Sequence, residues 1–189
     1  MNAPCTQGPR AANDSGPRQA SQIRWCVIHS AETSDDAGAD TTAEGVARFF
    51  ASPSTQASTQ LAVDRDTCVR MLPDLVIPWG AVGANTAGLH LELCGRARWN
   101  RAEWLQLPRQ PMLDRAAFKV AMWCFHYQIP VRWVGPAGLR RGRKGLTTHN
   151  DVNAAFEHGT HWDPGPGFPH DVFLDSVATY LLAIKASRA

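Results

Sequence analysis

Apolar residues recur with two different periods along the chain, and the shorter period indicates strands. The run Ile23–His29, IRWCVIH, is rich in β-branched and aromatic residues and predicts a buried strand that ends at His29. The segments TQLAVD and CVRML, separated by residues 65–67, predict a β-hairpin. In LHLEL, residues 89–93, apolar and polar positions alternate as in a half-exposed strand. Its leucines should face one side, and His90 and Glu92 should lie next to each other on the other side.

The longer period, close to 3.6 residues, predicts helices. Two of them begin with the spacing of a capping box, in which a glutamate follows the cap residue by three positions. A third, over residues 114–128, is apolar almost all round and should lie at the centre of the fold. The residues that carry these predictions are Thr41 with Glu44, Asn100 with Glu103, Asp114 to Gln128, and, for a closing amphipathic helix, Phe173, Val177, Tyr180, Leu181 and Ile184.

These elements interleave without strict β-α-β alternation. They predict an α/β fold, a single domain with a mixed central β-sheet flanked by helices. Residues 1–21 are rich in Ala, Gly, Pro, Ser, Asn and Gln, so we expect a flexible leader there and the folded domain over residues 22–189. The Gly-rich basic segment 135–145, GPAGLRRGRKG, is predicted to be a solvated loop.

Composition argues against nucleic acid and the membrane interior as binding partners of the protein. The chain has 189 residues, of which 44% are apolar and 19% charged, and a net charge of +2. This charge is too small for nucleic-acid binding driven by bulk electrostatics. No apolar run is long enough to cross a membrane, and the N-terminus lacks the apolar core of a secretory signal. We therefore expect a monomer that is synthesised in the cytoplasm and does not insert into membranes.

The cysteines are five in number and are scattered without a Cys-x-x-Cys pair. We expect most of them to be reduced, with Cys26, Cys94 and Cys124 as small core residues. The sequence leaves open whether two of the five form a disulfide.

Candidate chemistry lies in GTHWDPGPGFPHD, residues 159–171, and in two distant histidines. Asp163 precedes Pro164, and proline restricts the backbone on both sides of that bond, so Asp163 either caps a turn or points at a fixed partner. His29 ends a predicted strand and His149 follows the basic segment. Two histidine nitrogens and a carboxylate oxygen are standard zinc ligands, and three protein ligands leave a position open for water. A histidine at a strand end is more often just a partly buried side chain. These residues alone therefore do not show whether the chain binds a metal.

Five blocks of sequence favour metal ligands over structural side chains as the interpretation of these residues. They are VIHSAE, STQLAVDRD, PWGAVGANTAGLHLELCG, GLTTHNDV and HWDPGPGFP, and they occur in this order between residues 27 and 169. In this order the chain resembles the zinc-dependent N-acetylmuramoyl-L-alanine amidases, a family that includes peptidoglycan recognition proteins and many phage endolysins. The resemblance covers about residues 23–182.

The resemblance implies a role for particular residues. It implies that one zinc ion is held by His29, His149 and Asp163, and that Glu92 assists the attacking water. Where the family usually has an oxyanion-stabilising lysine, two positions before the last ligand, this chain has His161, which either donates to the oxyanion or lines the groove. The remaining expected site residues are Trp79 and Asn85 as substrate contacts, with packing as the alternative for Trp79, and Asp151, which either orients His149 or acts at a helix N-terminus.

Two departures from the family pattern affect the groove. The family's Trp-His pair is Trp79–Gly80 here, and Thr148 stands where glycine commonly precedes the second histidine. The lysine-to-histidine change at position 161 predicts a more acidic activity optimum than that of lysine-bearing relatives, because histidine loses its charge near neutral pH.

The resemblance implies hydrolysis of the amide between the lactyl group of N-acetylmuramic acid and L-alanine in peptidoglycan. An endolysin-like enzyme that reaches the wall after release is the favoured form of this function. The alternatives are a cytosolic amidase that recycles muropeptides and a non-catalytic peptidoglycan-binding module of the same fold. Filled positions for all three ligands favour an enzyme.

Overall fold

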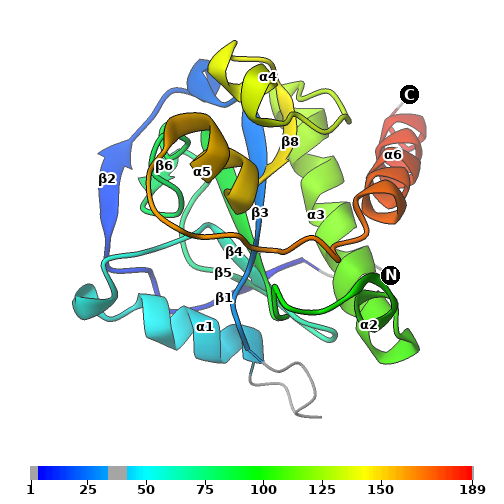
Figure 1. Cartoon of the computed structure of the whole chain (residues 1–189), viewed down its shortest axis with the longest axis horizontal. Coiled ribbons are helices and arrows are strands. Elements are labelled where there is room, and N and C mark those ends of the chain that lie inside the picture. The colour runs from blue at the N-terminus through cyan, green and yellow to red at the C-terminus, as the bar shows by residue number, and fades with distance from the viewer. Residues whose placement is uncertain (1–3, 34–41, 189) are drawn as a thin grey trace.

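The computed structural model describes residues 4–33 and 42–188, which form a central sheet with helices on both faces (Figure 1). The six-stranded sheet has the order β1-β5-β4-β7-β3-β8, and every pairing is parallel except the β4–β5 hairpin. A two-stranded antiparallel sheet, β2-β6, lies beside it. The strands are β1 Thr6–Gln7, β2 Asp14–Pro17, β3 Trp25–Ser30, β4 Leu61–Val63, β5 Cys68–Arg70, β6 Val76–Pro78, β7 Gly88–Leu93 and β8 Gly145–Thr148. The predicted mixed α/β fold is confirmed.

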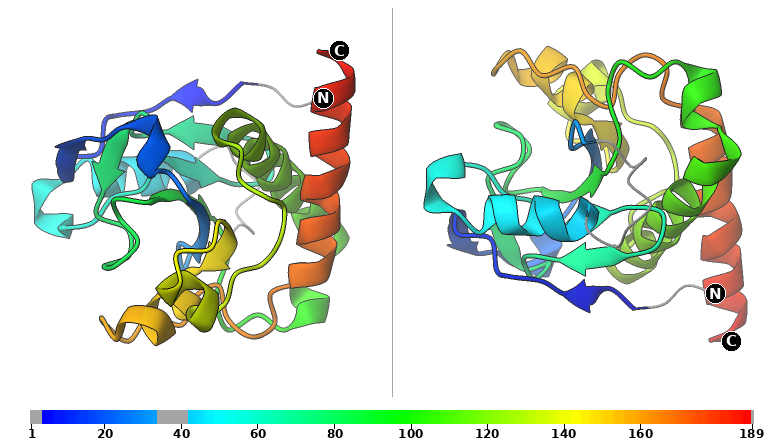
Figure 2. Two further views of the ribbon diagram at one scale, coloured as in Figure 1. Left: turned by 90° about the horizontal axis from the view of Figure 1, so that it is seen from above. Right: turned by 90° about the horizontal axis from the view of Figure 1, so that it is seen from below.

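Six α-helices and three short 3-10 helices complete the described residues. α3 packs on the central strands and α6 packs on α3, whereas α1 and α5 lie over the other face, at β4–β5 and at β3 (Figure 2). The α-helices are α1 Thr42–Phe50, α2 Arg101–Trp104, α3 Gln110–Tyr127, α4 Pro136–Arg140, α5 His149–Phe156 and α6 His170–Ala186. The 3-10 helices are η1 Ala20–Gln22, η2 Pro53–Thr55 and η3 Leu107–Arg109.

Helix starts were predicted with mixed success. Asn100 and Glu103 form the expected capping box of α2. Thr41, the predicted cap of α1, lies outside the described residues. At the start of α1, the amide of Ala43 donates to the Asp64 carboxylate of the β4–β5 hairpin, 2.9 Å away. The hairpin therefore fixes the N-terminus of the helix that packs on it.

Alternation along β3 and β7 divides the sheet into an apolar face and a site face. The leucines of β7 and the residues Cys26 and Ile28 of β3 belong to the main core, which includes α3 and α6. Trp25 and Val27 pack in a smaller cluster with α4 and α5. All six residues of β7 are buried, so the prediction of a half-exposed strand is wrong. The reason is that β7 lies between β4 and β3 with elements on both of its faces.

The prediction that residues 1–21 form a flexible leader is wrong for residues 4–21. β1 pairs with β5, β2 pairs with β6, and the buried Arg18 guanidinium donates five hydrogen bonds of 2.7–3.1 Å. Burial lowers the pKa of Arg18 to about 10, which leaves it charged at neutral pH. The acceptors are the backbone carbonyls of Asp74, Asn85, Thr86 and Gly88. An expectation built on apolar burial misses this segment, because backbone pairing and one buried cation hold it.

The structure resolves one question that the sequence left open, and it corrects one local prediction. Cys5 and Cys68 form a disulfide across 63 residues, because the pairing of β1 with β5 brings them together. Cys26, Cys94 and Cys124 are free and buried, as predicted. Within the segment 135–145, residues 136–140 form α4 rather than a loop, because Leu139 is buried in the smaller apolar cluster. No helix in the described part of the chain is long and apolar enough to span a membrane.

Candidate metal centre and active site

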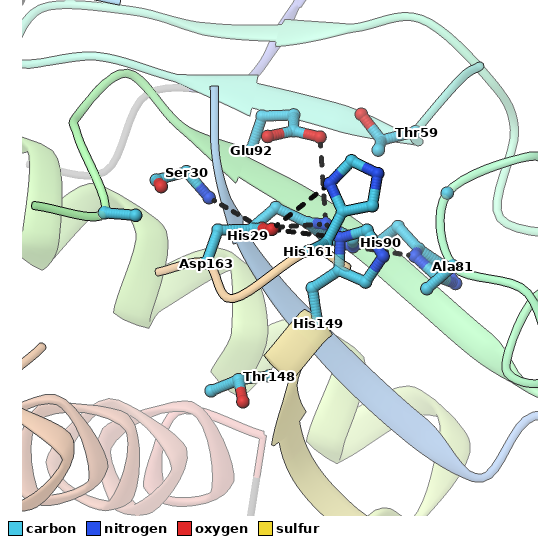
Figure 3. A network of polar contacts seen from close by, with 12 residues as sticks. His29, Ser30, Thr59, Ala81, His90, Glu92, Thr148, His149, His161 and Asp163 are labelled. Atoms are coloured by element: carbon cyan, nitrogen blue, oxygen red, sulfur yellow. Dashed lines mark hydrogen bonds and ion pairs between the residues drawn. The ribbon is translucent and has the colours of Figure 1, made fainter. Parts of the chain in front are cut away.

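The site begins where two neighbouring parallel strands present polar side chains to the same face. His29 of β3 is in register with Glu92 of β7, and the two side chains lie beside each other above the sheet (Figure 3). His29 is 2% exposed and Glu92 is 7% exposed. Strand register therefore brings together two residues that are 63 positions apart, and burial limits their movement.

His149 and Asp163 approach His29 from outside β3 (Figure 3). His149 is the first residue of α5, directly after β8, which pairs with β3. Asp163 lies in the loop before α6, where its carbonyl accepts from the Asn150 amide at 3.0 Å and its Oδ2 accepts from the Ser30 amide at 3.3 Å. The loop is therefore tied to both elements that carry the histidines.

The three side chains form what we call the metal-ligand cluster: His29, His149 and Asp163. The two histidine Nδ1 atoms are 3.1 Å apart, and the Asp163 oxygens lie 3.3 Å from His29 Nδ1 and 3.1 Å from His149 Nδ1. Ligands at about 2.0–2.1 Å from a tetrahedral zinc ion are about 3.3 Å from one another. The cluster therefore has the size and the donor atoms to hold a metal ion.

Burial and charge set the protonation of the cluster. Burial lowers the pKa of His29, which favours the neutral ring that a metal requires. Burial acts to raise the pKa of Asp163, but hydrogen bonds from His149 and His29 outweigh it and hold this pKa well below its ordinary value. Asp163 is therefore a carboxylate.

The pKa of Glu92 is shifted in the direction opposite to that of Asp163. Burial, together with the nearby charges of Asp163 and Glu32, raises the pKa of Glu92 well above its ordinary value. Its Oε1 is 4.0 Å from His29 Nδ1, beside the cluster rather than within it. The two carboxyl groups of this site thus have very different pKa values. Such a difference is typical of an active site in which one carboxylate acts as a ligand and the other transfers protons.

A groove of about 1090 Å³ opens from the cluster and is lined by His29, Glu92, His149, His161 and Asp163 at one end. Its other walls come from α1, from residues 56–59 and from residues 79–82. Phe49, Trp79 and Val82 are 61%, 40% and 57% exposed there. The arrangement places exposed apolar surface beside buried polar chemistry, as expected for a site that binds an extended ligand.

Comparison with known proteins decides the family. A model of the family described as N-acetylmuramoyl-L-alanine amidase matches residues 19–166, a span that contains the whole cluster. The chain belongs to the N-acetylmuramoyl-L-alanine amidase family. It is an amidase that acts on peptidoglycan, as the sequence blocks predicted. A search of the curated proteins found no match.

Solved structures share the fold of this amidase at low sequence identity. The Staphylococcus aureus hydrolase AmiA, solved in complex with its ligand, has a TM-score of 0.74 and 15% identity, with 98% of this chain and 87% of AmiA covered. A mutant endolysin from Bacillus subtilis has a TM-score of 0.61 and 16% identity, with 93% and 99% covered. The amidase LysC from Clostridium intestinale has a TM-score of 0.56 and 12% identity, with 93% and 99% covered. These likenesses confirm the predicted fold.

The predicted groove residues of the amidase have different surroundings. The Trp79 indole N–H donates to Ser15 Oγ at 2.8 Å, and the rest of the ring is open to the groove. Asn85 also lines the groove, but its Oδ1 accepts from the amides of Gly80 and Ala81. Asn85 therefore shapes the loop that carries Trp79, and a substrate contact by either residue stays a prediction.

His161 lies over the cluster without being part of it. Its ring stacks on that of His149, with centroids 4.4 Å apart, and its Nδ1 is 3.8 Å from Asp163 Oδ1. The side chain is 66% exposed, and its backbone carbonyl accepts from Asn153. This position allows an N–H to reach a substrate oxygen in the groove.

Thr148 and Asp151 are explained by the helix that they begin. Thr148 Oγ accepts from the Asp151 amide at 3.1 Å and donates to the Asp151 carboxylate at 3.0 Å. Of the two roles considered for Asp151, the structure favours the one at the helix N-terminus. Threonine in place of glycine thus supplies the N-cap of α5, whose first residue is His149.

Sequence reasoning missed three residues that support the site: Ser15, Arg18 and His90. Ser15 and Arg18 carried no detectable signal, because they lie in a segment without apolar periodicity. For His90 a signal existed, since alternation placed it on the same face as Glu92. In the structure its Nδ1 is 2.9 Å from His29 Nε2.

Proposed function

We propose that this amidase uses a zinc ion held by His29, His149 and Asp163. The observation that carries the proposal is that the two histidine Nδ1 atoms are 3.1 Å apart and each lies 3.1–3.3 Å from an oxygen of the Asp163 carboxylate, Oδ2 for His29 and Oδ1 for His149. These distances are close to the edge length of a tetrahedral zinc site. When bound, zinc lowers the pKa of a water molecule to about 7 and polarises the carbonyl oxygen of the scissile amide.

Glu92 is proposed as the group that moves the proton. It accepts a proton from the attacking water and delivers it to the nitrogen of the departing L-alanine. Its raised pKa suits this exchange, because a general acid–base is most effective when its pKa is near the working pH. Its place on β7, in register with His29, keeps the carboxyl group beside the metal-ligand cluster.

His161 is proposed to donate an N–H to the oxygen that becomes negative as water attacks. Its exposure and its stacking on His149 support this role, because the ring is held over the cluster yet remains open to the groove. Trp79 and Asn85 are proposed to contact the substrate on the other side of the groove. The bond cleaved is the amide between the lactyl group of N-acetylmuramic acid and L-alanine.

We further propose that the biological role is lysis, as for an endolysin that digests intact wall. The support is an open groove with exposed aromatic walls, which admits a polymer, and the shared fold with endolysin catalytic domains. Recycling of soluble muropeptides by a cytosolic enzyme and binding without catalysis are the alternatives. A recycling enzyme would prefer soluble fragments to walls, and a binding module would release no product.

The test is digestion of defined peptidoglycan by the wild type and by Asp163→Ala, with zinc content measured by elemental analysis and fragments identified by mass spectrometry. We expect about one zinc per wild-type chain, free L-alanine amino termini as product, and a loss of at least about 10³-fold in rate for the variant. Asp175→Ala, at an exposed position of α6, is the matched control and should behave as the wild type. Equal product from wild type and Asp163→Ala would exclude the metal mechanism.

A further inference from the structure

His90 is a buried imidazole that the proposed chemistry leaves unused. It lies on β7, is 0% exposed and therefore cannot touch substrate. Its Nδ1 is 2.9 Å from His29 Nε2, whereas His29 Nδ1 faces His149 and Asp163. His29 is thus held at both of its ring nitrogens, by the metal-ligand cluster on one side and by His90 on the other (Figure 3).

When His29 binds a metal through Nδ1, the contact specifies a tautomer for each ring. A neutral histidine that offers Nδ1 to a metal carries its hydrogen on Nε2. This N–H of His29 points at His90 Nδ1, which must then be the unprotonated acceptor. His90 in turn carries its own hydrogen on Nε2. With a metal bound, this hydrogen bond therefore holds the hydrogen of His29 on Nε2, leaves Nδ1 free for the metal and fixes the direction of the ring.

A buried polar ring costs folding free energy unless its nitrogens have partners, and an apolar side chain of similar size would need none. The His90 ring is sealed from solvent and has two such partners: Nδ1 faces His29 Nε2, and the ring also hydrogen-bonds the backbone carbonyl of Ala84. His90 is therefore poorly explained as a simple packing residue of β7.

Two glycines make room for the ring. A Cβ at Gly88 would lie 2.6 Å from His90 Nε2, and a Cβ at Gly80 would clash with His90 Nδ1. The space next to Gly80 is occupied by the imidazole of His90, which comes from β7.

We propose that His90 is a positioning residue for the metal centre, which accepts the His29 Nε2–H and orients the ring that binds the metal. We further assign Gly80 and His90 as a matched pair, in which glycine at one position permits histidine at the other. This inference rests on the proposed metal function.

The first experiment compares His90→Leu with His90→Asn in the full chain. Leucine fills the space without an acceptor, whereas the asparagine side chain can place an oxygen close to the position of Nδ1. Zinc affinity is measured by competition with a chelator, and folding of the zinc-free proteins by circular dichroism and thermal unfolding. We expect His90→Leu to bind zinc about 10–100-fold more weakly than the wild type, with the zinc-free fold intact, and His90→Asn to retain most of the affinity.

The outcomes separate the two proposals. A wild type that does not bind zinc overturns the proposed function. If the wild type binds and His90→Leu binds equally well, only the role of His90 is overturned. An equal loss in His90→Leu and His90→Asn would show that the acceptor is not what matters. In the zinc-loaded enzymes, we expect His90→Leu to lower kcat and to leave KM unchanged, because His90 does not reach the groove.

The second experiment tests the matched pair and does not depend on the leucine variant. Gly80→His alone should lower the thermal midpoint, because its Cβ would meet the ring of His90. His90→Gly alone should weaken zinc binding. The double variant Gly80→His/His90→Gly should bind zinc at least about 10-fold more tightly than His90→Gly, because an imidazole again lies next to His29. A double variant that binds no better than His90→Gly would overturn the assigned pairing.

Discussion

The metal-ligand cluster and the groove beside it are positioned by different kinds of contact. In the cluster, buried side chains contact one another, and strand register brings His29 beside Glu92. In the groove, exposed aromatic residues sit on segments that are held by hydrogen bonds between side chains and backbone. Arg18 donates to the carbonyls of Asn85 and Gly88, and Asn85 Oδ1 accepts from the amides of Gly80 and Ala81. The comparison teaches that the chemistry of this amidase depends on the central sheet, whereas its substrate surface depends on peripheral segments, including residues 4–21.

The largest effect should come from the cluster side of this comparison, in Glu92→Gln. We expect kcat to fall by about 10²–10⁴-fold, because glutamine cannot accept or deliver the proton.

The same variant should also change stability. The pKa of Glu92 is raised on folding, so the folded state of the zinc-free wild type loses stability as pH rises from the unfolded to the folded pKa of this group. Glutamine removes that loss, and the zinc-free variant should be at least as stable as the wild type at neutral pH. Steady-state kinetics and thermal unfolding check this, and an active variant would mean that another group moves the proton.

On the groove side, Arg18→Met should have the largest effect on stability. It removes five hydrogen bonds and leaves buried carbonyls without a donor, for a loss of about 3–4 kcal/mol in the free energy of unfolding. Urea denaturation measures this loss. Arg24→Met is the matched control, because Arg24 is exposed and its side chain bonds only the Gly142 carbonyl among the hydrogen bonds described. Equal stability of the two variants would contradict the role given to Arg18.

Removal of the disulfide tests whether residues 4–21 are held covalently as well. The variant Cys5→Ala/Cys68→Ala should lose about 2–4 kcal/mol, because the bond closes a loop of 63 residues. Zinc affinity should not change, since neither cysteine contacts the cluster. A reductant should destabilise the wild type by a similar amount and have no effect on the variant. A change of zinc affinity on reduction would show that the two regions are coupled more strongly than the comparison implies.

A smaller effect is expected from Trp79→Ala, which alters only the groove surface. KM for peptidoglycan fragments should rise about 5–10-fold with little change in kcat, because an aromatic contact worth about 1 kcal/mol is lost. Trp162→Ala is the control, since Trp162 is 49% exposed but lies outside the groove lining. If KM responds equally to both changes, Trp79 has no special contact with substrate.

The smallest change is expected in His161→Lys, at the border between the two regions. Lysine keeps its charge at higher pH than histidine does. We therefore expect the variant to retain activity further into the alkaline range than the wild type, with a similar maximum. A pH–rate profile measures this, and identical profiles for the two proteins would refute an electrostatic role of position 161.

The contrast between the cluster on the central sheet and the groove on peripheral segments also explains which features could be predicted from the sequence. β7 follows from alternation of apolar residues, β3 from a run of β-branched and aromatic residues, and the β4–β5 hairpin from two such segments separated by residues 65–67. The family resemblance then selected His29, His149 and Asp163, which the structure brings together. The helical part of the segment 135–145 was missed because only Leu139 anchors it. Arg18 was missed because its partners are carbonyls, which every residue has, so no residue type reveals them. The Cys5–Cys68 pair was left open because its basis is the pairing of a two-residue strand.

The hydrogen bonds from Arg18 have a practical meaning for anyone who builds chimeric lysins. A junction placed at residue 22, where the change in composition suggests a domain boundary, would keep the whole metal-ligand cluster yet discard Arg18 and Ser15. Such a fusion would have an intact cluster but a loosened groove, and its low activity would be mistaken for a defect of the cluster. The transplantable unit of this enzyme therefore includes Ser15 and Arg18.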